Sequence, residues 1–415
     1  MKTFKKADIL IPKVNFEKWS VVACDQYTSE PEYWEQVLKL VSDAPSTLKI
    51  TYPEVFLPLG DGEERIANIN ATMKEYIDEG IFEELPNSMI YVEREIAQGK
   101  IRKGVIGCID LEEYDFSKGS GSLVRATEGT VLERIPPRVK IRENAPLELP
   151  HIMILIDDDK KQIIEAIGEK KDNFEKLYDF DLMMNGGHIS GWKINGIDAD
   201  ALICGLQKLS DAFIENYGAD VPELIYAVGD GNHSLATAKT CWENLRATLT
   251  DEEKENHPAR YALCELVNLH DDALEFEPIH RVLFDVDKEN FLKELNSFYE
   301  ISTDECDAQC FECVFEDVRQ KLYIKNPSSN LVVGSLQKFI DYYIEKFGGS
   351  VDYIHGDDVT VRLGTKKGNM GFILPAMEKN QLFKTVIKDG ALPRKTFSMG
   401  EANEKRFYFE AKKIR

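Results

Sequence analysis

The chain has 415 residues, of which 43% are hydrophobic and 30% charged, so it has the composition of a folded globular protein with room for two or three domains. Its 73 acidic and 51 basic residues give a formal net charge of −22, which disfavours nucleic acid or anionic lipid as the main partner. No apolar run has the length of a membrane-spanning helix, and the charged start followed by Pro12 argues against a signal peptide, so we expect a cytoplasmic protein that does not bind membranes.

In chain order, the spacing of apolar residues predicts strands that alternate with helices. Strands are predicted as a pair within 88–114 that turns at Gln98-Gly99, and singly within 151–159, 188–197, 223–231 and 259–271. Helices are predicted within 30–42, 60–82, 161–180, 198–218, 233–249, 287–299, 333–347 and 378–389. This alternation predicts a mixed α/β (α+β) fold, and we expect one region over 1–280 and a second over 281–415.

A short segment between a predicted buried strand and a predicted helix has the pattern of a ligand-binding turn. Apolar residues over 224–228 lead into the turn, which consists of Gly229, Asp230, Gly231, Asn232, His233 and Ser234. The glycines let a ligand approach the backbone, and the first amides of a helix attract a phosphate. Asp230 can hold Mg²⁺ or accept a proton, and His233 can donate to an oxygen. The alternative is structural, with Asp230 and Asn232 only capping the helix.

Basic residues gather within 117–150, a long polar segment in an otherwise acidic chain. They are Arg125, Arg134, Arg138, Lys140 and Arg142, with Glu128 among them. They would supply positive charge for a phosphate, and a solvated loop is the alternative. His280-Arg281 and Lys395 are further candidates for binding an anion, against the alternatives of a buried structural pair and a surface turn.

The eight cysteines are scattered, unlike those of a secreted disulfide scaffold. Cys306, Cys310 and Cys313 nevertheless have the spacing of the cluster-binding motif in radical enzymes that use S-adenosylmethionine. The acidic surroundings oppose thiolate formation and the motif lies late in the chain, so a chance grouping is favoured over an iron–sulfur enzyme.

Five segments, in an order that is kept along the chain, resemble motifs of an uncharacterised bacterial family, domain of unknown function 1015. They are LVRATEGTVLERIPPRVKIREN at 123–144, VGDGNHSLATA at 228–238, FEPIHRVLF at 276–284, DYIHGDDV at 352–359 and ALPRKTFSM at 391–399. The second resembles the family's Asp-Gly-His-His-Arg motif, with Asn232 in place of His and Ser234 in place of Arg. Ser234 therefore lacks the guanidinium that would contact a phosphate through two hydrogen bonds.

The resemblance implies a fold, a reaction and a set of site residues. The family's motif is similar to that of the ParB/sulfiredoxin-like superfamily, which includes a kinase for free serine, so it implies a nucleotide-binding core of that type with additional α/β subdomains. It implies a phosphotransferase that uses ADP or ATP with Mg²⁺ and acts on a small hydroxylated metabolite, with a nucleotide hydrolase as the alternative enzyme. The residues assigned to the site are Asp230 and His233 for catalysis, Asp230 for Mg²⁺, and, for the nucleotide, Gly229, Gly231, Asn232, Ser234, Arg125, Glu128, Arg142, His280, Arg281 and Lys395. The alternative from another class is a non-catalytic protein that senses a nucleotide or metabolite, and a homodimer is compatible with both.

Overall fold

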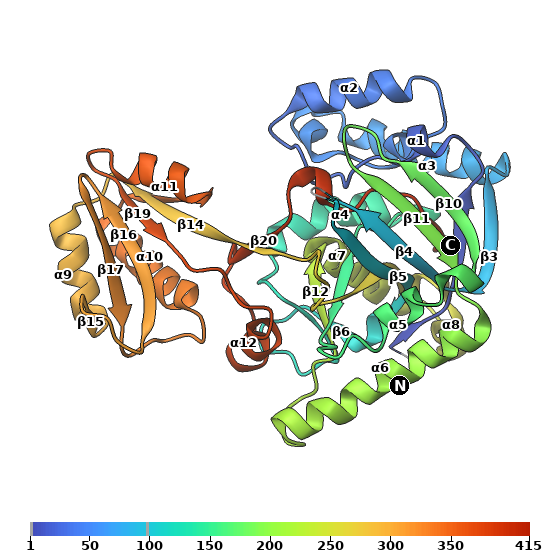
Figure 1. Ribbon diagram of the computed structural model, residues 1–415. Helices are drawn as coiled ribbons and strands as arrows, with labels where there is room; N and C mark the ends of the chain where they lie inside the picture. Colours follow the sequence, from blue (N-terminus) through green and yellow to red (C-terminus); the bar gives the residue numbers. More distant parts are fainter. Residues whose placement is uncertain (1–2, 97–98) are drawn as a thin grey trace. The chain divides into compact units, whose positions relative to one another are not determined.

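The computed structural model describes residues 3–96 and 99–415, and the chain divides into two compact units. Unit 1 comprises Met1–Leu274 together with Glu401–Arg415, and unit 2 comprises Glu275–Gly400 (Figure 1). This division differs from the expected one into 1–280 and 281–415, because unit 2 begins at Glu275 and residues 401–415 belong to unit 1. The mixed α and β architecture agrees with the prediction.

Unit 1 contains a large mixed sheet. Its strand order is β10-β11-β4-β5-β13-β9-β12-β7-β6, and β1 adds to β5. The pairs β13–β9, β12–β7 and β7–β6 are parallel, whereas β12 and β9 are antiparallel. The strands are β1 (Phe4–Lys5), β4 (Ile90–Glu95), β5 (Ile101–Asp110), β6 (Tyr114–Asp115), β7 (Val124–Ala126), β9 (Met153–Ile156), β10 (Glu175–Asp181), β11 (His188–Lys193), β12 (Tyr226–Asp230) and β13 (Tyr261–Asn268). Two smaller sheets pair β2 (Ala7–Pro12) with β3 (Phe82–Ser88) and β8 (Leu147–Glu148) with β21 (Lys412–Lys413).

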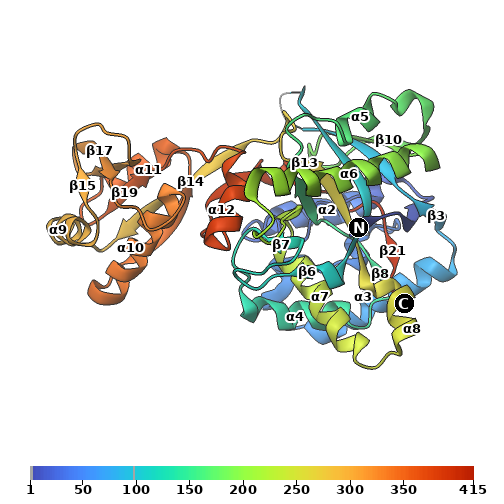
Figure 2. The same ribbon diagram turned by 90° about the horizontal axis from the view of Figure 1, so that it is seen from below.

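The helices of unit 1 pack beside this sheet. The helix that begins in the predicted turn, α7, packs against α4, and the long helix α6 lies apart from this pair in both views (Figures 1 and 2). The helices are α1 (Phe16–Trp19), α2 (Pro31–Val41), α3 (Gly62–Asp78), α4 (Ile135–Arg142), α5 (Ile164–Gly168), α6 (Gly196–Tyr217), α7 (Asn232–Arg246) and α8 (Asp251–Asn256). Within residues 3–96 and 99–415, the helices are all too short or too polar to cross a membrane.

Most predicted elements of unit 1 are confirmed, and one is wrong. The predicted hairpin within 88–114 is the antiparallel pair β4–β5, with Gly99 at a φ of +72° and Gln98 outside the described residues. The helix predicted over 161–180 is wrong, because α5 ends at Gly168 and β10 follows. In β10 the buried Tyr178 and Phe180 alternate with exposed neighbours, so pairing with β11 decides the conformation over the weak helical spacing.

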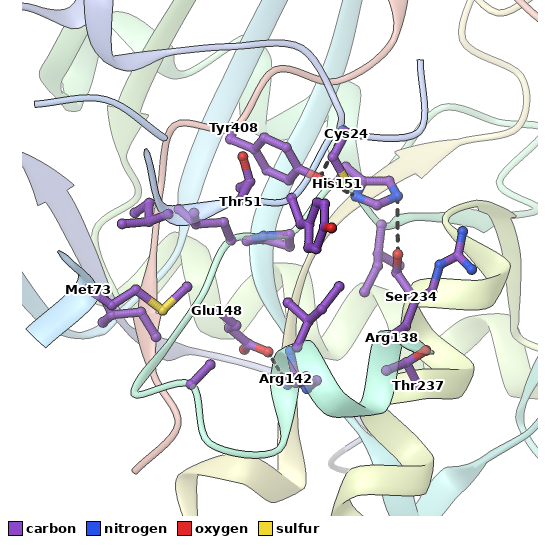
Figure 3. Close-up of a pocket in the computed structure, with 18 residues that line it drawn as sticks. Cys24, Thr51, Met73, Arg138, Arg142, Glu148, His151, Ser234, Thr237 and Tyr408 are labelled. Carbon is purple, nitrogen blue, oxygen red and sulfur yellow. Dashed lines mark hydrogen bonds and ion pairs between the residues drawn. The ribbon is translucent and has the colours of Figure 1, made fainter. Parts of the chain in front are cut away.

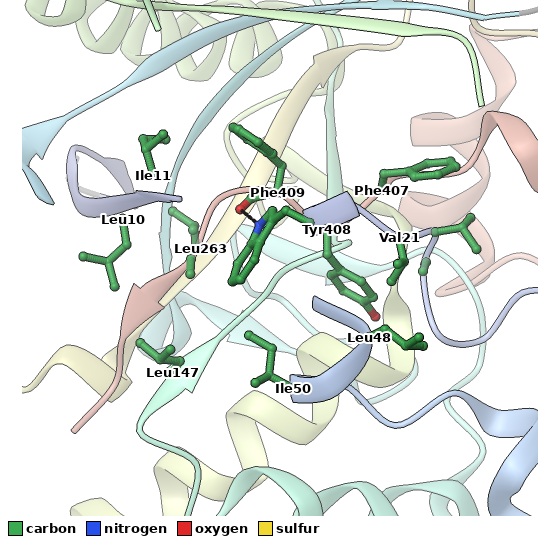
Figure 4. Packing of buried hydrophobic residues seen from close by; sticks show 14 of the residues in the cluster. Leu10, Ile11, Val21, Leu48, Ile50, Leu147, Leu263, Phe407, Tyr408 and Phe409 are labelled. Atoms are coloured by element: carbon green, nitrogen blue, oxygen red, sulfur yellow. Dashed lines mark hydrogen bonds between the residues drawn. The ribbon is translucent and has the colours of Figure 1, made fainter. Parts of the chain in front are cut away.

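The hydrophobic core of unit 1 is built around the C-terminal segment 401–415. Phe407, Tyr408 and Phe409 are buried in it, and the Trp19 indole donates a hydrogen bond of 2.9 Å to the Phe409 carbonyl (Figure 4). The buried Arg406 guanidinium lies between the carboxylates of Glu265 and Glu410, so each buried charge has a partner. This anchoring carries the neighbouring side chains of the segment to the end of the sheet where α7 begins.

Unit 2 also combines a β-sheet with helices. Its sheet has the order β15-β17-β16-β19-β14-β18, with β20 paired to β14. The strands are β14 (Phe276–Phe284), β15 (Ile301–Ser302), β16 (Gln309–Phe315), β17 (Val318–Ile324), β18 (Ser350–His355), β19 (Met370–Ile373) and β20 (Phe397–Met399). The helices are α9 (Lys288–Phe298), α10 (Val332–Phe347), α11 (Asp357–Gly364) and α12 (Gln381–Asp389), of which three match the helices predicted in this region.

Candidate functional site

The predicted turn between β12 and α7 has the expected strand–turn–helix geometry. Gly231 has a left-handed φ of +77°, and a side chain there would place its Cβ 3.0 Å from the Cα of Ile152, so only glycine fits without movement. Gly229 lies at a bulge, where the register between β12 and β9 shifts between Val228 and Asp230. Among the described residues, no side chain caps the start of α7. The helix therefore begins with the positive end of its dipole uncompensated by a capping oxygen.

Asp230 does not act as a cap. One carboxylate oxygen accepts a hydrogen bond of 2.8 Å from the Gly231 amide, and the other lies 3.2 Å from the Lys405 ammonium. Burial raises the pKa of Asp230, but Lys405 and His151 outweigh this effect, so its pKa lies below the ordinary value. Asp230 is therefore ionised at neutral pH and paired with a lysine that the C-terminal segment brings to this turn.

Asn232 and His233 connect the start of α7 to the loop that follows β7. The Asn232 amide nitrogen donates to the Val228 carbonyl and the Thr127 hydroxyl at 3.3 and 3.4 Å. Its amide oxygen is buried and has no partner among the described residues. The His233 Nε2 accepts a hydrogen bond of 3.3 Å from the Val131 amide, which leaves Nδ1 as the donor of the neutral ring. The capping role considered for Asn232 is therefore wrong, because its side chain turns back toward the strand.

Ser234 begins a chain of hydrogen bonds that sequence reasoning did not find. Its hydroxyl lies 3.2 Å from His151 Nε2, and His151 Nδ1 lies 3.1 Å from the Tyr408 hydroxyl (Figure 3). The Tyr408 hydroxyl also donates to the Cys24 sulfur at 3.1 Å. His151 comes directly before the apolar residues of a buried strand, and this position is the sequence signal that could have indicated it. Tyr408 lies within the C-terminal core segment, where no such signal is present. The two ring nitrogens of His151 thus have defined partners, which fixes the ring orientation.

Ser234 and Arg142 line the same cavity in unit 1, whose volume is 160 Å³. Arg142 lies at the end of α4, and one of its nitrogens is 2.5 Å from a Glu148 carboxylate oxygen (Figure 3). The cavity is lined by Cys24, Ile50, Thr51, Tyr52, Met73, Arg138, Ile141, Arg142, Ala145, Leu147, Glu148, Leu149, Pro150, His151, Ile152, Ser234, Thr237 and Tyr408. The structure therefore brings two arginines of the predicted basic cluster, Arg138 and Arg142, to the cavity that Ser234 also lines.

Arg125 has a different role from the one predicted. It lies in β7 beside β12, but it is buried, and its guanidinium donates to the carbonyls of Ser122, Pro222 and Glu223 at 2.7 to 2.8 Å. Since these acceptors hold it within the fold, Arg125 is a structural residue and not a phosphate contact. Glu128 follows β7 at the same edge of the sheet as Asp230, because β7 and β12 run parallel. The side chain of Arg134 lies outside the described part of the chain.

The three remaining candidates belong to unit 2, where His280 and Arg281 are buried and Lys395 is exposed. His280 Nε2 lies 2.8 Å from an Asp357 oxygen, and His280 Nδ1 accepts from the Leu374 amide at 3.1 Å. Burial lowers the pKa of His280, although Asp357 opposes this. Arg281 is fully buried and donates to Gln337 and to the carbonyls of Ile279, Arg394 and Lys395. Lys395 enters this network through its carbonyl, so the structural alternative accounts for the observed contacts.

The three cysteines with cluster spacing do not converge. Cys310 and Cys313 both lie in the regular strand β16, where residues three apart point to opposite faces. Cys313 is buried, and burial raises the pKa of its thiol. No group of three metal-ligating side chains occurs in residues 3–96 and 99–415. The spacing is therefore a chance grouping, as favoured from the sequence.

Comparison with known proteins identifies the family. The family model described as a protein of unknown function, DUF1015, matches residues 5–343, so the chain belongs to this family and the resemblance is confirmed. No curated protein matches the chain.

Solved structures with a similar arrangement share 11–12% sequence identity with it. A conserved hypothetical protein from Pyrococcus furiosus has a TM-score of 0.34, with 75% of this chain and 92% of that chain covered. A free serine kinase in complex with AMP has a TM-score of 0.38, with 76% and 93% covered. SbnI with a C-terminal truncation, from Staphylococcus aureus, has a TM-score of 0.35, with 71% and 83% covered. At this level of similarity, function has to be argued from the site itself, and the ParB/sulfiredoxin-like core stays a prediction.

Proposed function

We propose that the protein binds the phosphate of ADP or ATP at the start of α7 and transfers a phosphoryl group to a small hydroxylated metabolite. The observation that carries the proposal is the start of the helix, which follows a left-handed glycine and has no side-chain cap among the described residues. An anion is the natural partner of such a helix end, because amide hydrogens and the helix dipole both favour negative charge.

Lys405 supports the proposal because it compensates for the arginine that Ser234 replaces. Its ammonium lies 3.2 Å from a carboxylate oxygen of Asp230, the residue before Gly231. A phosphate at the helix start would therefore meet both the dipole and a lysine. Phosphoryl transfer depends on positioning and charge neutralisation more than on covalent chemistry, and these groups supply both.

Asp230 and His233 have complementary roles in this proposal. The lowered pKa of Asp230 makes it a weak base, so it acts mainly as an ionised group that positions Lys405. It is also the residue that would contact a Mg²⁺ ion carried by the nucleotide, where the ion would neutralise phosphate charge. His233 donates to a phosphate oxygen through Nδ1, since Nε2 already accepts from the Val131 amide.

Nucleotide binding is tested by calorimetric titration of the full chain with AMP, ADP and ATP in the presence of MgCl₂. The Lys405→Met variant is expected to bind ADP about tenfold more weakly or worse, as for the loss of a charged hydrogen-bond donor. Lys6→Met is the matched control, because Lys6 forms a 2.7 Å ion pair with Asp200 elsewhere in unit 1. Absence of binding for every nucleotide at millimolar concentration would refute the proposal.

A turnover assay distinguishes a phosphotransferase from the alternative, a non-catalytic sensing protein. Labelled ATP is incubated with a pool of small metabolites, and a phosphorylated product is expected. Asp230→Asn and His233→Ala should each lower turnover by roughly 100-fold, and His233→Ala should do so with little change in melting temperature. Nucleotide binding without any transfer would instead support a sensing protein. The cytoplasmic location and the homodimer stay predictions.

A further inference from the structure

We infer that the cavity beside the first turn of α7 binds the acceptor substrate, and that this substrate is a short hydroxy acid with an apolar body, one carboxylate and no ammonium group. The ligand's role as phosphoryl acceptor rests on the proposed function, whereas its binding depends only on the cavity.

The size of the cavity excludes the nucleotide and sets the size of the ligand. Its volume is 160 Å³, close to the engineered cavity of about 150 Å³ that holds one benzene molecule. Sites for larger, drug-sized ligands measure roughly 300 to 1,000 Å³. A ligand of about six to ten non-hydrogen atoms therefore fits the cavity, whereas a base with its ribose does not.

The walls of the cavity determine the body of the ligand. Most of the lining residues are apolar, and Ile50, Met73, Ile141 and Leu147 are among the aliphatic ones. Such walls favour a chain of methylene groups, since each buried methylene contributes about 0.8 kcal/mol. A ligand that is polar along its whole length would leave its polar groups unpaired against these walls.

One side of the cavity carries a cluster of charges that favours a carboxylate. Glu148 is fully buried, and its two oxygens already bind Arg142 at 2.5 Å, the Leu263 amide at 2.8 Å and Lys412 at 3.4 Å. The cluster of Arg142, Lys412 and Glu148 thus has one excess positive charge. Arg142 keeps further N–H groups beyond its contact with Glu148, and a guanidinium can bind two carboxylates. An ammonium group would face the Arg142 guanidinium, while Glu148 is already paired with Arg142 and Lys412.

Another part of the cavity wall suits a hydroxyl group. Ser234 Oγ and His151 Nε2 lie 3.2 Å apart in the cavity wall, and Tyr408 holds the other side of the imidazole. A ligand hydroxyl here can donate to one of these groups and accept from the other. Ser234 lies in the first turn of α7, so the hydroxyl would lie near the phosphate that we place at the helix start. A longer side chain at residue 234 would occupy this end of the cavity.

The test uses three probes of equal length that differ at one end. They are 5-hydroxypentanoate, 1,5-pentanediol and 5-amino-1-pentanol, each titrated into the full chain without nucleotide. The hydroxy acid is expected to bind at least tenfold more tightly than the diol, and the amino alcohol most weakly. Equal affinities, binding of none of the three, or a preference for the amino alcohol would overturn the inference.

Variants of Arg142 test whether the preference for the hydroxy acid arises in the cavity. Arg142→Gln should abolish the preference for 5-hydroxypentanoate over the diol, and Arg142→Lys should keep it in weaker form. Arg246→Gln is the matched control, since Arg246 pairs with Glu112 at 2.8 Å at the other end of α7. An Arg142→Gln variant that folds and keeps the full preference would contradict the inference. If Arg142→Gln does not fold, the relative affinities of the wild-type chain for the three probes still test the inference.

A parallel titration with ADP distinguishes this inference from the proposed function. Binding of ADP without the hydroxy acid refutes the cavity assignment and leaves the nucleotide site standing. Binding of the hydroxy acid without any nucleotide supports the cavity assignment and refutes the proposed phosphotransferase.

Discussion

Replacing Gly231 by alanine tests the geometry on which the nucleotide site depends. The left-handed φ of +77° costs a residue with a Cβ about 1–2 kcal/mol. The new Cβ would also lie 3.0 Å from the Cα and 3.2 Å from the Cγ1 of Ile152, so backbone must move at a further cost of about 1–3 kcal/mol. We therefore expect Gly231→Ala to lower the free energy of unfolding of unit 1 by about 2–5 kcal/mol. The movement would also displace His151, whose ring lies 3.5 Å from the same position.

Gly80→Ala is the matched control for this substitution. Gly80 has a similar φ of +66°, but a Cβ there meets no atom of the described residues within 4 Å, so only the backbone cost of about 1–2 kcal/mol applies. Urea unfolding followed by tryptophan fluorescence reports on unit 1, because all four tryptophans lie there. Equal losses for the two variants would refute the close approach of Gly231 to Ile152. Weaker binding of ADP to Gly231→Ala than to Gly80→Ala is expected as well.

Three further predictions follow from named contacts. Burial first, and then Asp25, raises the pKa of the Cys24 thiol to about 12, so at pH 8 only about one thiol in 10,000 is ionised. Iodoacetamide should therefore modify the exposed Cys204 well before the half-buried Cys24, and equal labelling rates would contradict the raised pKa of Cys24. Because the pKa of Asp230 is lowered in the folded chain, its ionised form stabilises unit 1 above the unfolded pKa, and this contribution should disappear as the pH falls below about 4. Urea unfolding of wild type and Asp230→Asn should therefore differ near neutral pH and converge in acid, and a constant difference would exclude this linkage. Arg281→Met should destabilise unit 2 by roughly 3 kcal/mol through lost hydrogen bonds, measured by amide hydrogen exchange of unit 2, and unchanged protection would show that the network is not structural.

The parts of the site that local chemistry encodes could be predicted from the sequence. A buried apolar run that ends in Gly-Asp-Gly before a polar helix start specifies a strand, a tight turn and a helix, and β12, Gly231 and α7 confirm it. The same reasoning failed for Asn232, which was considered as a helix cap. A short polar side chain suits a cap, but it equally suits the observed hydrogen bond back to the Val228 carbonyl of the strand.

The parts that depend on distant segments could not be predicted. Lys405 and Tyr408 reach the site because residues 401–415 return from unit 2 and pack into the core of unit 1, and no local pattern indicates that return. Arg125 and Arg142 look alike in the sequence, yet one is buried among carbonyls and the other lines the cavity. Their roles are decided by which elements pack beside them, which composition and spacing do not specify.

A crystal structure of the full chain with ADP and MgCl₂ tests the central claim most directly. The account predicts a phosphate of ADP at the start of α7, with its oxygens roughly 3 Å from backbone amides of the first turn and from Lys405 Nζ. The adenosine would lie outside the cavity lined by Arg142 and Ser234. A nucleotide whose phosphates lie away from the start of α7 would contradict the account.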